Sequence, residues 1–320
     1  MSLVQVLKQR PSKTSLPNLL RFFSTEKPTS PHFDRLVNEA GQSRDFPTIH
    51  SLLTQRVQAG CFNTTNTFSF VTHADPTTLL PHLIPAISSL DEGFSRKNAF
   101  DSLIARLSKS HPDHALHVLD EMLQRRIGAN AVTFYPLLSH LSRNKWMDRV
   151  SDLLELMRRE GIPPDTTCYN YVLSALCHLG DLPAAATALN SMLQEGLVAD
   201  SMTFDALVLG ACRAGRFDGA VALVRRMEEE GVHGMYSTYA HIIRGLLHVG
   251  GHGEAIEFVR CVGGTCGRER RLDGENYGVL GRGLLRRERW EEVTIVVREM
   301  QDKGLEVEDK LMDAYIMHTE

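Results

Sequence analysis

Apolar residues along most of this chain recur at spacings of three and four, the pattern of amphipathic helices. One such run begins near Thr203, whose hydroxyl can cap a first helical turn, and continues to Cys212. Gly215 follows and can supply the left-handed backbone on which many helices end. A second helical run then occupies Phe217, Ala220, Leu223, Val224 and Met227. The pattern predicts two short helices joined at a glycine.

This two-helix pattern repeats along the chain with a period of 35 residues. The repeated positions hold an aromatic residue (Phe134, Tyr169, Phe204, Tyr239), two glycines (Gly180, Gly215, Gly250 and Gly161, Gly196, Gly231), a methionine (Met122, Met157, Met192, Met227) and a small or branched residue (Val150, Ala185, Ala220, Ala255). Two short helices cannot bury their apolar faces alone, so successive pairs must stack. The predicted fold is an all-α solenoid of stacked helix-turn-helix units.

The repeat predicts the domain boundaries. Its units span 30–64, 65–96, 97–130, 131–165, 166–200, 201–235, 236–273 and 274–308, followed by a C-terminal tail at 309–320. The 38-residue unit 236–273 has three extra residues, which we expect in the glycine-rich loop at 263–267. Residues 65–96 fit poorly, and their three prolines are expected to break a regular helix pair. That segment is predicted to be a degenerate repeat.

The units resemble pentatricopeptide repeats. The resemblance is carried by Tyr169 and Asn170 at the start of one unit, by Gly180 and Met192 within it, and by closing segments at 161–165 (GIPPD) and 196–200 (GLVAD). It covers about residues 30–308 and points to the plain, repeat-only class with plant-like mitochondrial members. Only twelve residues follow 308, so we expect no appended catalytic domain, no enzyme activity and no cofactor.

The resemblance implies single-stranded RNA binding on a concave face, with one base read by the fifth and last residues of each repeat. The residue pairs at these positions are Asp101 with Asn130, Tyr135 with Asp165, Asn170 with Asp200, Asp205 with Met235, Ala240 with Asp273, and Gly278 with Glu308. Only Asn170 with Asp200 is a standard pair, and it implies a preference for uracil. The alternative is that these are ordinary polar residues of helix starts and loops.

A basic or titratable residue occupies the thirteenth position of six units. These residues are Lys109, Arg143, His178, Arg213, His248 and Arg286. A solenoid would align them into a stripe that could follow a phosphate backbone. Cations also complement the negative end of a helix dipole, and this effect alone could select them. The second position, apolar in the family, keeps Val132 and Met202 but is replaced by Thr167, Ser237 and Glu275. Glu275 argues against RNA binding by the last unit.

The N-terminal stretch 1–23 has four basic residues and no acid, mixed with serine and apolar residues. This composition is typical of a mitochondrial presequence ending near residues 21–24, although a basic tail is the alternative. The whole chain carries 35 Lys and Arg against 39 Asp and Glu. Without the four basic residues the remainder has a net charge of −8, so any phosphate binding must be local. We expect a mitochondrial matrix protein.

Other candidate chemistry is weak. The glycines at 278–283 lie within a predicted helix and fit packing better than a nucleotide fingerprint. Cys261 and Cys266 with their nearby histidines do not have zinc-site spacing. The histidines at 111, 114 and 117 have near-helical spacing but no companion carboxylates, and are expected on the solvated surface. No membrane segment, metal or small-molecule substrate is expected. Two hypotheses remain: an RNA-binding protein of mitochondrial transcript processing, stability or translation, and a scaffold for protein partners, for example within the mitochondrial ribosome.

Overall fold

The computed structural model describes residues 28–262 and 270–319, and this part of the chain contains sixteen α-helices, one 3-10 helix and no strand. The prediction of an all-α fold is confirmed. The chain divides into two compact units, Met1–Gly128 (unit 1) and Ala129–Glu320 (unit 2). The predicted presequence at 1–23 and the glycine-rich loop at 263–267 lie outside the described residues. None of the described helices combines the length and apolar character needed to span a bilayer.

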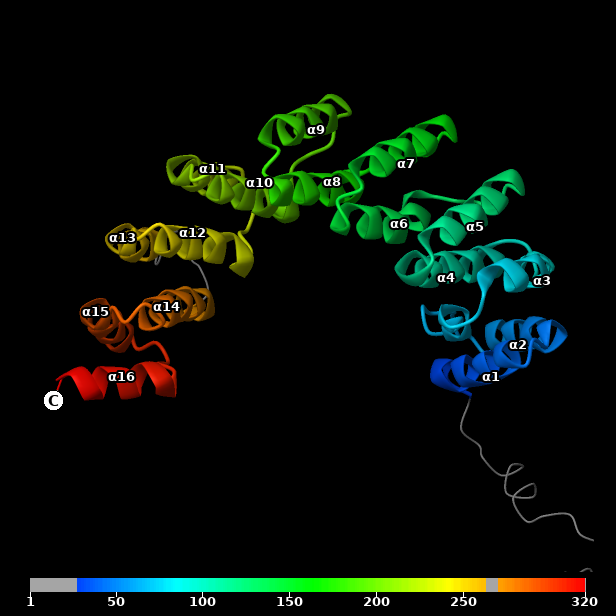
Figure 1. Ribbon diagram of the computed structural model, residues 1–320, viewed down its shortest axis with the longest axis horizontal. Coiled ribbons are helices and arrows are strands. Elements are labelled where there is room, and N and C mark those ends of the chain that lie inside the picture. The colour runs from blue at the N-terminus through cyan, green and yellow to red at the C-terminus, as the bar shows by residue number, and fades with distance from the viewer. Residues whose placement is uncertain (1–27, 263–269, 320) are drawn as a thin grey trace, which may run out of the picture. The chain divides into compact units, whose positions relative to one another are not determined.

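Unit 2 consists of helix pairs that follow the 35-residue period. The helices are α6 (Ala131–Arg143), α7 (Met147–Arg159), α8 (Thr166–Leu179), α9 (Leu182–Gln194), α10 (Ser201–Arg213), α11 (Phe217–Glu229), α12 (Tyr236–His248), α13 (His252–Val262), α14 (Arg270–Leu285), α15 (Trp290–Asp302) and α16 (Asp309–Thr319). The first helices of successive pairs pack against one another. Within this unit they line the inner side of a curved stack, and the second helices form its outer side (Figure 1).

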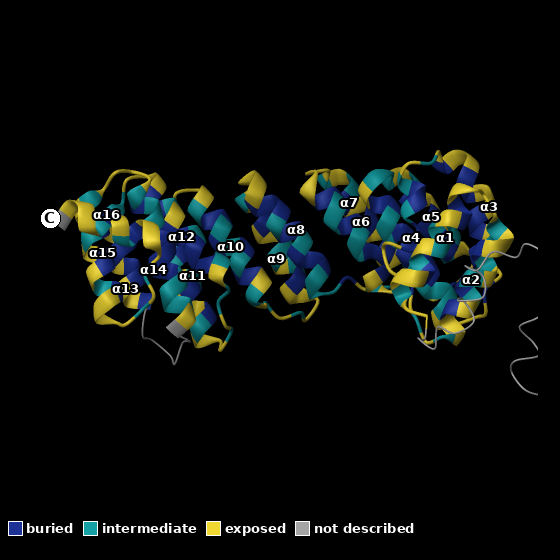
Figure 2. Ribbon diagram, turned by 90° about the horizontal axis from the view of Figure 1, so that it is seen from below, coloured by how far each residue is buried: buried dark blue, intermediate teal, exposed yellow. Residues whose placement is uncertain are grey.

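The repeated apolar positions form the core between these two layers. Phe134, Tyr169, Phe204 and Tyr239 are at most 3% exposed, and the repeated methionines are also buried. Figure 2 shows buried residues along the helices of the stack, alternating with intermediate and exposed residues. The period therefore arises because every pair buries the same side chains against its neighbours.

The turns between helices use left-handed backbone at fixed positions. Gly180 and Gly215 end first helices with φ of 78° and 70°, as the sequence predicts. At the equivalent position of the preceding unit Lys145 adopts φ of 62°. The turn that ends the second helix shows the same contrast, with Gly161 at 70° and Arg126 at 54°. Because a Cβ disfavours this conformation, the non-glycine turns hold local strain.

Replacing Arg126 with Gly is therefore expected to raise the free energy of unfolding by roughly 0.5–1 kcal/mol, since the relieved backbone strain exceeds the added entropy of the unfolded chain. The matched change Gly161→Ala should lower it by about 1 kcal/mol. Urea titration followed by circular dichroism measures both. If both substitutions change the free energy of unfolding in the same direction, backbone strain at these turns does not determine their effect on stability.

Unit 1 departs from the period in one place. Its helices are α1 (Ser30–Gln42), α2 (Phe46–Gln58), η4 (Ser69–Thr72), α3 (Pro76–Ser88), α4 (Phe94–Ser110) and α5 (Pro112–Gln124). The prolines do not break α3, because Pro76 starts it and Pro81 and Pro85 lie on its exposed face. The missing element is the first helix of the pair, in whose place stands the single 3-10 turn η4. The segment still stacks, since η4 packs against α1 and α4, and α3 packs against α2 and α4.

The segment expected as a C-terminal tail forms helix α16. It packs against α14 and α15, buries Leu311 completely and leaves Ala314 only 8% exposed. The Trp290 ring stacks on His318 at a centroid distance of 4.2 Å. Helix α16 therefore covers apolar surface of the preceding pair, α14 and α15.

Candidate functional site

A cleft of about 550 Å³ opens where α6 and α8 lie side by side in unit 2, and we call it the α6–α8 cleft. Its lining includes Arg143, Asn170, His178 and Asp200, four of the residues that the sequence predicts as a site. They come from α6, from α8 and from the residue that precedes α10, so the stacking of two successive repeats, 131–165 and 166–200, brings them together.

Asn170 and Asp200 contact each other directly. The Asn170 Nδ2 group donates to Asp200 Oδ1 at 3.0 Å and to Oδ2 at 3.1 Å. Thr203 Oγ1 donates to Asn170 Oδ1 at 2.7 Å, which fixes the orientation of the amide. Asp200 also caps α10 by accepting a bond from the Thr203 amide at 2.8 Å. Asn170 is 8% exposed, whereas Asp200 is exposed, so a rigidly held carboxylate faces the cleft.

The preceding pair, Tyr135 and Asp165, is also in contact. The Tyr135 hydroxyl donates to Asp165, which caps α8 through the Cys168 amide at 3.0 Å. Burial, together with the Asp165 carboxylate, raises the pKa of Tyr135 to about 12, so the phenol stays protonated. Its ring lies 6.2 Å from that of Tyr171, edge to face, and Tyr171 lines the cleft. This repeat therefore offers an aromatic surface instead of an amide.

Asp205 has a different set of partners from the one expected. Its carboxylate accepts hydrogen bonds from Ser237 at 2.7 Å and Thr238 at 2.8 Å, and lies 3.6 Å from the His241 ring nitrogen. Burial by itself would raise the pKa of Asp205, but the contacts with His241, Ser237 and Thr238 outweigh it and hold the pKa below its usual range. Asp205 thus joins α10 to the first turn of α12.

The pair Asp101 and Asn130 is divided between the two units, and each residue has a local role. Asp101 Oδ2 lies 2.5 Å from the Lys97 ammonium, one turn away on α4. Asn130 caps α6 in a capping box with Thr133.

The thirteenth-position residues of unit 2 are exposed in the last turns of their helices or directly after them. Arg143 and His178 line the α6–α8 cleft. Arg213 and His248 line a second cleft of about 510 Å³ between α10 and α12, and Arg286 lines a third of about 210 Å³ between α12 and α14. Consecutive clefts on the inner side of unit 2 therefore each contain part of the basic column.

Three arginines that the sequence analysis missed extend this column. Arg244 and Arg282 lie one turn before His248 and Arg286, and Arg287 follows directly. The i, i+4 spacing of Arg244 with His248 and of Arg282 with Arg286 is the signal that could have revealed them, because it places both members on one helix face.

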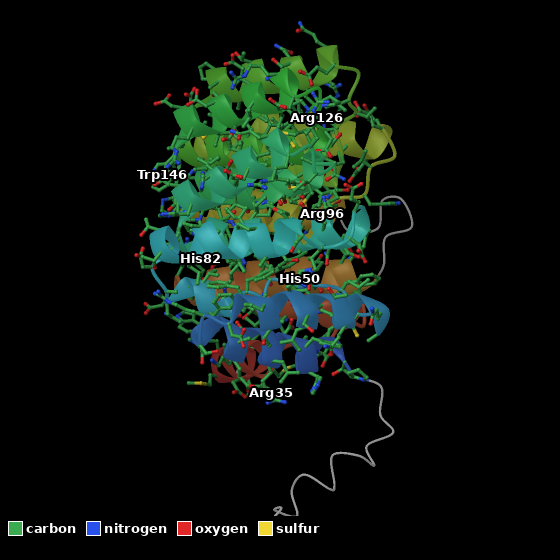
Figure 3. All side chains as sticks on the ribbon, turned by 90° about the vertical axis from the view of Figure 1, so that its right-hand side faces the viewer. Arg35, His50, His82, Arg96, Arg126 and Trp146 are labelled. Carbon is green, nitrogen blue, oxygen red and sulfur yellow. The ribbon has the colours of Figure 1, made fainter. Side chains whose placement is uncertain are left out.

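The basic residues of unit 1 are more dispersed. Lys109 is exposed in the last turn of α4. Figure 3 shows Arg35, His50, His82 and Arg96 apart from one another, on α1, α2, α3 and α4 respectively.

Two apolar side chains from the second position of their repeats lie on the surface. Val132 is 56% exposed and Met202 is 52% exposed, and Met202 lines the α6–α8 cleft. Exposed apolar groups at a polar cleft can contact the faces of nucleic-acid bases.

Within the described residues, no group of three or more His, Cys, Asp or Glu side chains could hold a metal ion. His111 and His114 contact each other ring to ring at 6.1 Å. Cys261 is exposed, and Cys266 lies outside the described residues.

Comparison with known proteins identifies the family. A mitochondrial pentatricopeptide repeat-containing protein of Arabidopsis thaliana is 38% identical over 313 residues, which cover 97% of this chain and 89% of that protein. The chain belongs to the pentatricopeptide repeat family. A second mitochondrial pentatricopeptide repeat-containing protein of the same plant is 45% identical over 113 residues, 35% of this chain and 32% of the relative.

Individual pentatricopeptide repeats are also recognised. The PPR repeat family model matches residues 129–178, and PPR repeat models match 167–197 and 195–228. Among solved structures, a pentatricopeptide repeat protein in complex with an 18-nucleotide psaJ RNA element has 16% identity and a TM-score of 0.46 over 95% of this chain. This chain covers 53% of that protein, about half its length. The pentatricopeptide repeat domain of Arabidopsis thaliana protein-only RNase P 1, in complex with tRNA, has 17% identity and a TM-score of 0.40. The match covers 55% of this chain and 91% of that domain.

Proposed function

We propose that this pentatricopeptide repeat protein binds single-stranded RNA in the mitochondrial matrix and acts there, without a catalytic step, in transcript processing, stability or translation. The observation that carries the proposal is the α6–α8 cleft, which is lined by the hydrogen-bonded pair Asn170 and Asp200 together with Arg143 and His178. A cleft that combines base-edge partners with cations suits a nucleotide strand whose bases are unpaired and accessible.

Uracil fits the polar pair chemically. Uracil presents one N–H donor between two carbonyl acceptors, and the exposed Asp200 carboxylate can accept from that donor while the Asn170 amide donates to a carbonyl. Tyr171 and Met202 supply aromatic and apolar surface in the same cleft. The mitochondrial location is supported by the composition of residues 1–23 and by the names of the two Arabidopsis relatives.

A second candidate is a scaffold that binds protein partners, for example within the mitochondrial ribosome. It is favoured by the net charge of −8 beyond the first 23 residues and by Met235, Ala240 and Gly278 at positions where the family carries base-reading polar groups. Binding of the protein to pooled short single-stranded RNAs, measured at two salt concentrations, separates the candidates. RNA binding that weakens with salt supports the first, and failure to bind any RNA supports the second.

Replacing Asn170 with Ala is expected to reduce a preference for uracil at one RNA position by roughly tenfold, the equivalent of one or two net hydrogen bonds. Competition binding between RNAs that differ at that position measures the change. The matched control is Asn190→Ala, which removes an exposed amide from α9 on the outer side. Unchanged discrimination in Asn170→Ala, with RNA affinity retained, would contradict base reading by this pair.

A further inference from the structure

The clefts on the inner side of unit 2 differ in chemistry along the stack. In the α6–α8 cleft Asp200 and Asn170 accompany the cations. The cleft between α12 and α14 is lined by Arg244, Arg282, Arg286 and Arg287 together with Leu247, Val279 and Gly283. Among the described residues, no carboxylate lines this α12–α14 cleft, and none lines the neighbouring cleft between α10 and α12. The cationic character is therefore concentrated in the later repeats.

Helices α12 and α14 approach closely, and the four arginines line the small cleft between them. A Cβ added to Gly283 would lie 2.3 Å from the Leu247 side chain, so a glycine is what lets the two helices approach this closely. Arg244 and Arg286 are exposed, and within the described residues neither forms an ion pair. Arg282 is paired with Glu308, and Arg287 donates to the Gly283 carbonyl at 3.0 Å. At least two like charges thus face one cleft of about 210 Å³ without a counter-charge.

The fifth-position residues of these two repeats also favour phosphate binding over base reading. Ala240 is completely buried, and Gly278 carries no side chain. A Cβ at Gly278 would lie 3.1 Å from the Arg282 guanidinium, so the glycine leaves room for Arg282 to reach Glu308. Neither residue can hydrogen-bond a base edge through its side chain. These repeats retain the cations and lack a hydrogen-bonding side chain at the fifth position, one of the two base-reading positions.

We propose that Arg244, Arg286 and Arg287, oriented beside Arg282, form a phosphate-binding clamp between α12 and α14 that anchors an RNA strand whose bases are read in the α6–α8 cleft. The inference deepens the proposed function and rests on it. Guanidinium groups suit this role because each presents two parallel N–H donors to phosphate oxygens and stays charged at any physiological pH. The phosphate could be an internal diester or a terminal monoester, and the clamp chemistry is the same.

The test compares two charge-matched variants of the full chain. The clamp variant carries Arg244→Gln, Arg286→Gln and Arg287→Gln. The control variant carries Arg159→Gln, Arg225→Gln and Arg298→Gln, three exposed arginines of the second helices α7, α11 and α15. The probes are short uridine-rich single-stranded RNAs with and without 5′ and 3′ terminal phosphates. Affinity is measured over a series of salt concentrations.

The clamp variant is expected to bind RNA about 10- to 100-fold more weakly at low salt, and its slope of log affinity against log salt should be shallower by roughly two, for three lost phosphate contacts. The control variant should stay within about twofold of the wild type. Loss of wild-type affinity on removing a terminal phosphate assigns the site to that end. Indifference to the termini, with a weakened clamp variant, assigns it to internal phosphates.

Failure of the clamp and failure of RNA binding give different results. If RNA binds and the two variants behave alike, the clamp is wrong and the proposed function stands. If the wild type binds no RNA, the proposed function fails. Thermal unfolding with inorganic phosphate then tests whether the clamp binds phosphate at all. A rise in the Tm of the wild type with phosphate, absent from the clamp variant, supports an anion site, and no rise overturns it. Polyglutamate that binds as tightly as RNA would overturn the RNA assignment in favour of an acidic protein segment.

Discussion

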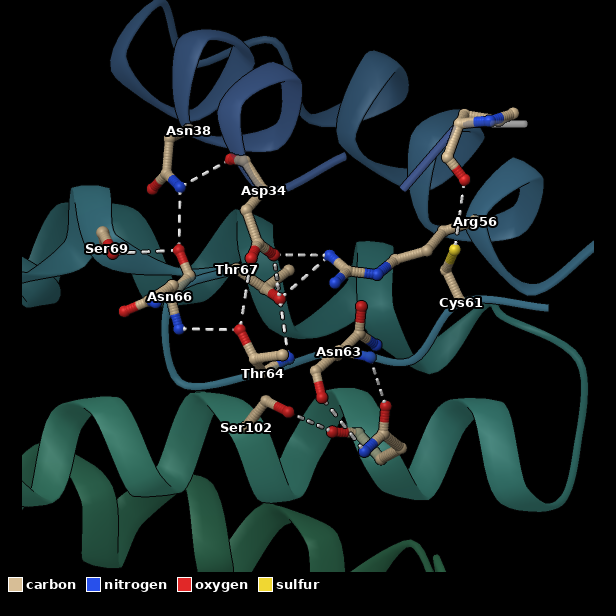
Figure 4. Close-up of polar contacts among 12 residues, drawn as sticks. Asp34, Asn38, Arg56, Cys61, Asn63, Thr64, Asn66, Thr67, Ser69 and Ser102 are labelled. Atoms are coloured by element: carbon tan, nitrogen blue, oxygen red, sulfur yellow. Dashed lines mark hydrogen bonds and ion pairs between the residues drawn. The ribbon is translucent and has the colours of Figure 1, made fainter. Parts of the chain in front are cut away.

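Replacing Asp34 with Ala is expected to lower the free energy of unfolding of unit 1 by about 3–5 kcal/mol, because it leaves a buried guanidinium without its carboxylate. Arg56 is fully buried, and its Nη1 lies 2.6 Å from Asp34 Oδ1. Thr67 joins the pair, since its hydroxyl donates to Asp34 at 2.7 Å and accepts from Arg56 at 3.0 Å. Thr64 donates to the other carboxylate oxygen at 3.2 Å (Figure 4).

Two comparisons make this prediction specific. The double variant Asp34→Leu with Arg56→Met should be far more stable than Asp34→Ala, because no unpaired charge remains in the interior. Arg35→Ala, which breaks the exposed pair with Glu39, should change the unfolding free energy by less than about 1 kcal/mol. Urea titration of the full chain measures all three. An effect of Asp34→Ala no larger than that of Arg35→Ala would show that the buried pair does not hold unit 1 together.

This polar network explains why residues 65–96 could not be predicted from the repeat. Thr64 and Thr67 reach back to Asp34, and Asn38 donates to the Asn66 carbonyl at 2.8 Å. These bonds fix the chain before η4 in place of a first helix. They join residues about 30 positions apart, and periodicity carries no information about such contacts. The prolines, the obvious local signal, lie on the exposed side of α3 or at its start.

The helices of unit 2 could be predicted because each depends on residues that recur in every unit. Buried aromatic and methionine positions, with glycine at left-handed turns, are local or nearest-neighbour features. The contact between Asn170 and Asp200 follows from the same regularity, since the last residue of one unit precedes the next first helix. Asp205 breaks that rule because Met235 offers no polar group, and hydroxyls of the next first turn replace it. The sequence predicts that Asp205 occupies a base-reading position. It does not predict that Ser237 and Thr238 take the place of Met235 as its partners.

The core of unit 2 leads to the second large effect. Phe204 is 3% exposed and belongs to the buried cluster that includes Val208 and Ala220. Phe204→Ala is expected to lower the free energy of unfolding by about 3–5 kcal/mol, because apolar surface is no longer buried and a cavity is left behind. Because each repeat contacts only its neighbours, the loss should be regional. Hydrogen exchange should speed up in α8, α10 and α12 and stay unchanged in unit 1.

The control for this experiment is Val198→Ala, which truncates a side chain that is 74% exposed and should change neither stability nor exchange by a measurable amount. Hydrogen exchange followed by mass spectrometry resolves the helices separately. An equal loss of protection in unit 1 after Phe204→Ala would contradict nearest-neighbour stacking and show one cooperative fold. A regional loss would instead mean that the α6–α8 cleft can open while unit 1 stays folded. RNA bound across neighbouring repeats should then restore protection there, because a ligand that binds only the folded state stabilises it.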